Sequence, residues 1–165
     1  MRKIEQRLTS YWRLEALNIL FVPAMMLWLA GGNVGAVSWI AILAMSLLLA
    51  IGAYYWRAKL MGIQSGEALK PSIERIGRLE LPAALLTAVS AVIAVAAWIE
   101  PSLSAGLADR IVASCAAGLA VLEYVNYYHR QLQHFDHAAD FRRLLEGRGF
   151  RKSQLRSDLE RFGLR

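Results

Sequence analysis

The chain has 165 residues, of which 56% are hydrophobic and 19% are charged, and its mean hydropathy is +0.35. Soluble domains of this size carry about 25% charged residues, so this composition predicts an integral membrane protein with one domain. The single cysteine, Cys115, excludes a scaffold held together by intramolecular disulfides.

Four apolar segments, at about 14–30, 34–55, 80–99 and 105–128, are long enough to cross a membrane as helices. A hydrocarbon core of about 30 Å takes about 20 helical residues. The first segment also has the basic start of a signal peptide, but residues 27–30 form a poor cleavage site, and we expect a membrane helix. Residues 1–128 are therefore predicted to form an all-α integral membrane four-helix bundle.

Two features of these segments concern their packing. Pro23 removes a backbone hydrogen bond near the middle of the first span, which predicts a kink. Helices in lipid approach most closely at small residues, and such residues recur on the third and fourth spans at Thr87, Ala91, Ala94, Ala97, Ala113, Ser114, Ala117, Gly118 and Ala120. We expect the two helices to pack together through these residues, or one of the faces to form an oligomer.

The loop between the second and third spans is predicted to contain a short helix over residues 71–79 that leads into the third span. Ile73, Ile76 and Leu79 recur on one side of it, opposite charged residues. This pattern indicates a helix that lies on the membrane surface with those three side chains in lipid.

Lys and Arg residues are distributed very unequally between the two sides of the predicted membrane. Of the 19 in the chain, only Arg110 falls on the side of the first and third loops. Cytoplasmic loops retain positive charge, so both termini are predicted to be cytoplasmic, with the bacterial inner membrane as the expected location. This bias and the attraction to anionic lipid account for the net charge of +6, and nucleic-acid binding is not expected.

Polar side chains gather near the predicted inner boundary. Glu123 lies roughly 10 Å inside the apolar region, counted at about 1.5 Å per residue from Arg130, and an ionisable group at such a depth is a functional candidate. The candidate ligand- or ion-binding residues are Glu123, Asn126, Glu15, Asn18, Glu80 and Arg130. We expect the three carboxylates to converge, either on a ligand or in a salt-bridge network that orients the helices.

Residues 129–165 are predicted to form a basic amphipathic cytoplasmic tail. Because residues 124–145 contain neither Gly nor Pro, we expect the fourth helix to continue without a break to Leu145. Ser153 is predicted to cap a second, short helix that ends near Phe162, with Leu155 and Leu159 on one side. These helices are expected to lie on inner-leaflet lipid or on the middle loop, or to dock a protein partner.

Metal and cofactor sites are not expected. His134, His137 and Asp140 share one surface of the predicted tail helix and are weak candidates for metal ligands, but no second cluster completes a tetrahedral set. The spans contain no histidine, which excludes a haem held between them.

Three functions remain open. The first is a non-catalytic accessory or scaffold protein whose basic tail binds anionic lipid or a protein partner, as a homo-oligomer or as a subunit of a membrane complex. The second is a small transporter or channel around Glu123, and the third is a membrane enzyme that acts on lipid headgroups. The apolar outer half of the spans and the lack of a known catalytic motif favour the first and make an enzyme less expected.

Overall fold

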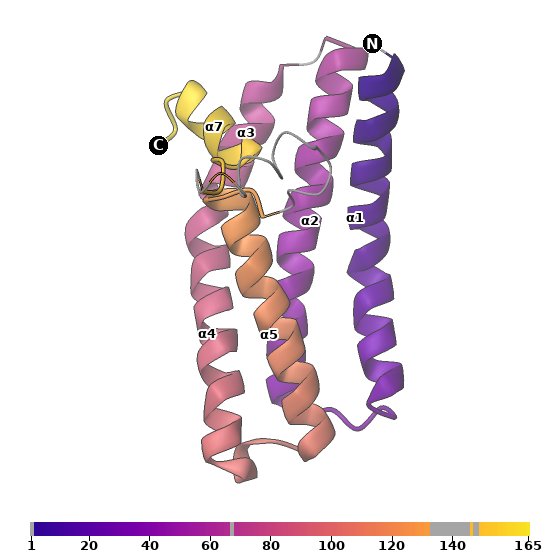
Figure 1. Ribbon diagram of the computed structural model, residues 1–165, viewed down its shortest axis with the longest axis vertical. Coiled ribbons are helices and arrows are strands. Elements are labelled where there is room, and N and C mark those ends of the chain that lie inside the picture. Colours follow the sequence, from indigo (N-terminus) through magenta and orange to yellow (C-terminus); the bar gives the residue numbers. More distant parts are fainter. Residues whose placement is uncertain (1, 67, 133–145, 147–148) are drawn as a thin grey trace.

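The computed structural model describes residues 2–66, 68–132, 146 and 149–165, and these residues form helices joined by short turns (Figure 1). The long helices are α1 (Arg2–Leu29), α2 (Ala36–Gln64), α4 (Glu80–Ile99) and α5 (Leu107–Tyr128). The shorter elements are α3 (Leu69–Arg78), the 3-10 helix η1 (Pro101–Leu103) and α7 (Gln154–Arg161). The prediction of an all-helical chain with four helices long and apolar enough to cross a membrane is confirmed.

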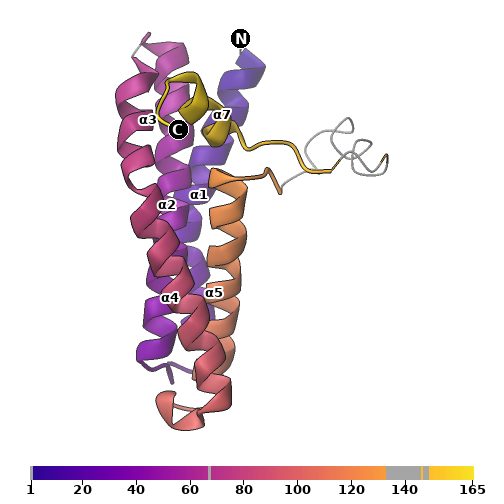
Figure 2. The same ribbon diagram turned by 90° about the vertical axis from the view of Figure 1, so that its left-hand side faces the viewer.

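The helices run side by side and leave both termini at one end of the molecule (Figures 1 and 2). We call this the basic end; α1 begins there, α2 ends there, and α3 and α7 lie there. The opposite end contains residues 30–35 and 100–106, and we call it the far end. The third and fourth spans match α4 and α5 closely, whereas α2 continues to Gln64, well past the predicted boundary at residue 55.

The central helix is α2, which packs against α1, α4 and α5. Its buried residues occur on several sides of the helix, as expected for a helix surrounded by others. Among the long helices, α1 packs mainly along α2, and most of its span is exposed: Leu20 is 75% and Trp28 is 78% accessible. In a membrane these side chains of α1 face lipid.

The expected contact between α4 and α5 is present, and the Trp98 indole N–H of α4 donates to the Ser114 hydroxyl of α5 across it at 2.9 Å. Of the small residues expected there, Ala91, Ser114 and Gly118 are not buried. The buried small residues on the two helices are Ala83, Thr87, Ser90, Ala94, Ala97, Ala113, Ala116, Ala117 and Ala120. Short side chains let the two backbones approach closely, which strengthens van der Waals contact between helices in lipid.

The prediction that the fourth helix continues to Leu145 is wrong at its first step, because α5 ends at Tyr128. The N–H groups of His129 and Arg130 both donate to the carbonyl of Val125, at 3.0 and 2.8 Å, and close the helix. The chain then pairs with a returning segment, since the Gln131 N–H donates to the Arg151 carbonyl at 3.0 Å. This long-range pairing overrides the local helix preference; the predicted helix over 133–145 lies outside the described residues.

The short helix predicted after Ser153 is confirmed as α7. The Ser153 Oγ accepts a hydrogen bond from the Arg156 N–H at 3.0 Å, which is an N-cap contact. Leu155 and Leu159 are each 1% exposed, and α7 packs on α3 and α5. The tail helix therefore lies on the middle loop, which was one of the two positions expected for it.

The expectation that α3 rests on the membrane through its apolar side is wrong. Ile73 and Ile76 are fully buried in the same apolar cluster as Leu155 and Leu159 of α7. Leu159 lies so close to Gly77 that a Cβ there would meet its Cδ2 at 3.0 Å. Helix α7 thus packs on Ile73 and Ile76, two of the three residues that the sequence pattern had assigned to lipid, whereas Leu79 at the end of α3 is 39% exposed.

Leu159→Ala is expected to release α7 from α3. Truncating a fully buried leucine costs about 3 kcal/mol, and α7 has only eight residues to hold it in place. Proteolysis should cut the chain between Phe150 and Ser153 faster in this variant than in Arg161→Ala, which alters an exposed position of the same helix. Equal cleavage of the two variants would show that burial of Leu159 does not hold α7.

Candidate functional site

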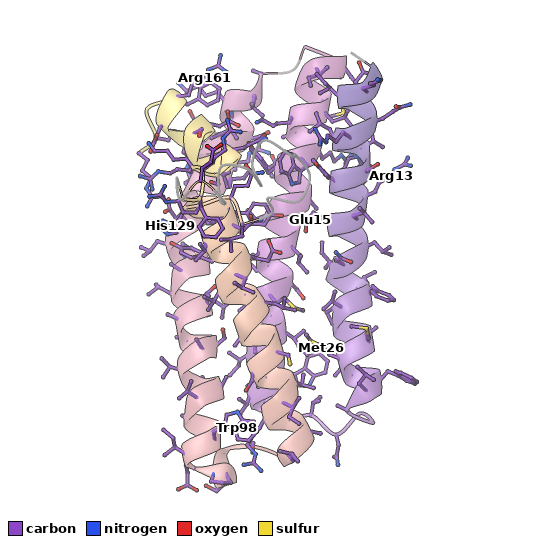
Figure 3. All side chains as sticks on the ribbon, viewed as in Figure 1. Arg13, Glu15, Met26, Trp98, His129 and Arg161 are labelled. Atoms are coloured by element: carbon purple, nitrogen blue, oxygen red, sulfur yellow. The ribbon has the colours of Figure 1, made fainter. Side chains whose placement is uncertain are left out.

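The polar cluster near the basic end centres on Tyr127, a residue that the sequence did not single out as a site candidate. Tyr127 is 3% exposed, and its hydroxyl donates to Glu15 Oε1 at 2.5 Å, which links α5 to α1. Trp56 of α2 and Tyr127 line the same small pocket. In Figure 3 the Glu15 side chain points from α1 toward the other helices, whereas Arg13 points away from them.

Glu123 and Asn126 complete this cluster from α5. The Asn126 Nδ2 donates to Glu123 Oε2 at 3.4 Å, and its Oδ1 accepts from the Leu132 N–H at 2.9 Å. The carboxylates of Glu123 and Glu15 are close enough to repel each other. Both also lie close enough to Tyr127 to interact electrostatically with its hydroxyl. Within the described part of the chain, neither carboxylate forms an ion pair.

Glu80 and Arg130 do not join this cluster. Glu80 forms an ion pair with Arg165 at 2.5 Å, and Arg130 Nη1 donates to the Phe150 carbonyl at 3.1 Å. Glu80 begins α4, which packs on α2 and α5 and has no comparable contact with α1. Of the three carboxylates expected to converge, Glu15 and Glu123 lie close together, whereas Glu80 forms an ion pair with the C-terminal segment.

A groove of about 510 Å³ adjoins Glu15. One wall is the face of α1 that carries Arg7, Tyr11, Glu15 and Asn18, and it includes apolar side chains of the same helix. The opposite side is formed by Trp56 of α2 together with Gln131 and Gln154 from the tail. Asn18 thus lines the groove, whereas Glu123 and Asn126 do not; Asn126 lines a neighbouring small pocket together with Tyr127.

The C-terminal segment is fixed to the basic end by polar contacts. Asp158 accepts a hydrogen bond from the Tyr55 hydroxyl at 2.7 Å and pairs with Lys59 at 3.0 Å. Hydrogen bonds from Arg156 and then Lys152 hold the pKa of Glu160 below its usual value. All of these contacts tie α7 to α2 or stabilise α7 itself.

His129 lies at the junction of α5 and the tail. Burial first, and then the positive charge of Arg165, lower the pKa of its imidazole. The depressed pKa favours a neutral imidazole in the folded protein. As the pH falls through the unfolded-state pKa, the unfolded chain binds a proton at His129 before the folded one does, and the stability of the fold decreases.

A second buried polar group, which the sequence analysis missed, lies at the far end. Asp109 is fully buried near the start of α5 and accepts hydrogen bonds from the Ser38 N–H at 3.3 Å, the Ser38 hydroxyl and the Ala105 N–H at 2.9 Å. An acid in the first turn of a predicted helix is a signal that could have drawn attention to it. Since Asp109 is saturated by contacts with its neighbours, we assign it a structural role.

The weak metal candidates His134, His137 and Asp140 lie outside the described residues. Within the described ranges, no three His, Cys, Asp or Glu side chains are grouped so that they could hold a metal ion. Comparison with protein-family models, with curated proteins and with solved structures found no match to this chain.

Proposed function

We propose that this chain is a non-catalytic four-helix membrane protein, with both termini cytoplasmic, whose basic end binds anionic inner-leaflet lipid. The observation that carries the proposal is a pair of arginines, one on α1 and one on α2, that each lie beside the same tryptophan. The guanidinium carbons of Arg13 and Arg57 each lie 5.8 Å from the Trp12 ring centroid. Both arginines are exposed, and neither has a carboxylate partner among the described residues.

The chemistry of this Arg13–Trp12–Arg57 cluster suits a lipid phosphate. Guanidinium groups donate two parallel hydrogen bonds to phosphate oxygens, and tryptophan favours the membrane interface. The Trp12 indole N–H is buried without a hydrogen-bond partner. The cluster therefore offers positive charge, without a carboxylate partner among the described residues, in the part of the molecule that leads to the basic end.

The lengths of the helices fit a basic end that projects beyond the hydrocarbon core. Helices α1 and α2 have 28 and 29 residues, which at 1.5 Å per residue gives about 42 Å, against a hydrocarbon core of about 30 Å. If the far end lies at one membrane surface, both helices project roughly 10 Å beyond the other. The projecting turns belong to the basic end, where their charges meet headgroups and water.

Replacing both arginines with glutamine (Arg13→Gln, Arg57→Gln) is expected to weaken binding of phosphatidylglycerol about tenfold, since each charge-assisted contact to phosphate is strong. The measurement is retention of phosphatidylglycerol by the full chain in native mass spectrometry. Arg78→Gln, at an exposed position of α3, is the matched control and should change retention little. Equal retention by the double variant and the control would contradict the proposal.

A second candidate function, a small proton or cation transporter, is favoured by Glu15 and Glu123, two carboxylates with no described cation partner. An ionisable side chain at this depth in a membrane often belongs to an ion pathway. In the far half, however, Ser90 donates to the Thr87 carbonyl at 2.8 Å and Asp109 is bonded to its neighbours, which favours the first proposal.

Flux in liposomes separates the two candidates. Transport is supported if the unaltered protein carries protons or sodium down a gradient and Glu123→Gln abolishes the flux without impairing assembly. The absence of flux under either gradient would remove this candidate.

A further inference from the structure

The groove beside Glu15 combines opposite charges, amide groups and an apolar wall at the level of the inner membrane boundary. We infer that it binds an ethanolamine phospholipid, with the ammonium group on Glu15 and the phosphate toward Arg7. The inference rests on the proposed function, because it takes the basic end to lie at the inner face of a membrane.

The charged groups lie along one face of α1. Arg7, Tyr11, Glu15 and Asn18 follow one another at spacings of four, four and three residues, so they share a side of the helix, and all four line the groove. Arg7 and Glu15 are two turns apart, about 12 Å along the axis. The Arg7 guanidinium lies 5.9 Å from the Tyr11 ring centroid, which brings its charge one turn closer to Glu15.

The groove is also open toward lipid. Helix α1 packs along α2 but makes no comparable contact with α5, although the Tyr127 hydroxyl reaches Glu15 between them. Leu8 and Leu14 add apolar surface to the wall. A volume of about 510 Å³ is in the range of small-molecule sites, and we expect the acyl chains to leave along the exposed side of α1.

Hydrogen-bonding capacity selects the headgroup. A primary ammonium donates three N–H bonds, and the groove offers acceptors in the Glu15 carboxylate, whose Oε1 accepts from Tyr127, and in the side-chain carbonyl of Asn18. The Gln154 carbonyl at the groove already accepts from Lys59 at 3.2 Å. A choline group has no N–H and relies on aromatic faces, but Arg7 already lies over Tyr11. A headgroup with negative charge alone would be repelled by Glu15.

The test is native mass spectrometry of the full chain equilibrated with equal amounts of phosphatidylethanolamine, phosphatidylcholine and phosphatidylglycerol. The unaltered protein is expected to retain the ethanolamine lipid about tenfold more than the choline lipid, because a charge-assisted hydrogen bond contributes about that factor. Glu15→Gln should remove this preference. Glu5→Gln, the same substitution on the same helix but outside the groove, should leave it intact.

Equal retention of the ethanolamine and choline lipids by the unaltered protein would overturn the inference, and would indicate that the groove is filled by protein or by unselected lipid. A preference that survives Glu15→Gln would overturn it as well. Because the headgroup comparison needs no substitution, it decides the matter even if Glu15→Gln fails to fold. If phosphatidylglycerol retention persists while the ethanolamine preference is absent, the inference fails and the proposed function stands; if no lipid is retained, both fail.

Discussion

Asp109→Ala is expected to destabilise the far end more than any other single truncation there, lowering the free energy of unfolding by about 3 kcal/mol. The carboxylate joins the start of α5 to the start of α2 through the Ser38 backbone and hydroxyl, and to the preceding turn through Ala105. Removing it deprives the buried Ser38 N–H of its side-chain acceptor, whereas the Ser38 hydroxyl still donates to the backbone carbonyl of residue 109 at 2.8 Å. An unsatisfied buried donor costs more than the bond contributed.

Thermal unfolding in detergent tests this prediction, with Glu100→Ala as the control at the same end. Glu100 is exposed and bonds to Ser102 within its own turn, so its loss should shift the midpoint little. Asp109→Asn, which keeps the shape and one acceptor, should fall between the two. If Asp109→Ala unfolds at the same temperature as Glu100→Ala, the proposed structural role of Asp109 is wrong.

Gly52→Ala is expected to separate Tyr127 from Glu15. Gly52 lies on the buried side of α2, and a Cβ there would collide with the phenol ring and hydroxyl of Tyr127. The ring must move, which breaks the hydrogen bond that links α5 to α1. We expect a lower unfolding temperature together with loss of the ethanolamine-lipid preference, because Glu15 loses the partner that positions it.

The matched control for Gly52→Ala is Gly118→Ala, since Gly118 is a helical glycine of α5 at which an added Cβ meets nothing within 4 Å. Alanine is the better helix former by about 1 kcal/mol, so the control should be neutral or stabilising. Tyr127→Phe removes the hydroxyl alone and isolates the contribution of its hydrogen bond. Effects of the same sign for Gly52→Ala and Gly118→Ala would contradict the close contact between Gly52 and Tyr127.

The features that the sequence predicts correctly are local ones. A run of apolar residues long enough to span a membrane determines its own helix, because backbone groups in lipid must be satisfied within the segment. Ser153 likewise caps α7 through a contact three residues away. Such signals depend on near neighbours and can be recognised before the fold is known.

The features that the sequence does not predict depend on partners far along the chain. The apolar side of α3 could face lipid or pack against α7. The burial of Ile73 and Ile76 can therefore be predicted only when it is known that Leu159 of α7 packs in the same cluster. Helix α5 ends at Tyr128 because residues 151 and 153 pair with its continuation, although the local sequence favours helix. Tyr127 donates a hydrogen bond to Glu15, which is 112 positions away in the sequence. Helical spacing rules relate only residues within a few turns, so they cannot predict this contact.

Lipid binding at the basic end requires that this end face the cytoplasm, and cysteine accessibility tests this orientation most directly. In a Cys115→Ser background, a single cysteine is placed at Ser65, after α2 at the basic end, or at Asn33, in the turn at the far end. In intact cells, a membrane-impermeant thiol reagent should label the cysteine at position 33 and leave position 65 unlabelled until the membrane is permeabilised. Labelling of position 65 in intact cells, with position 33 protected, would contradict the account.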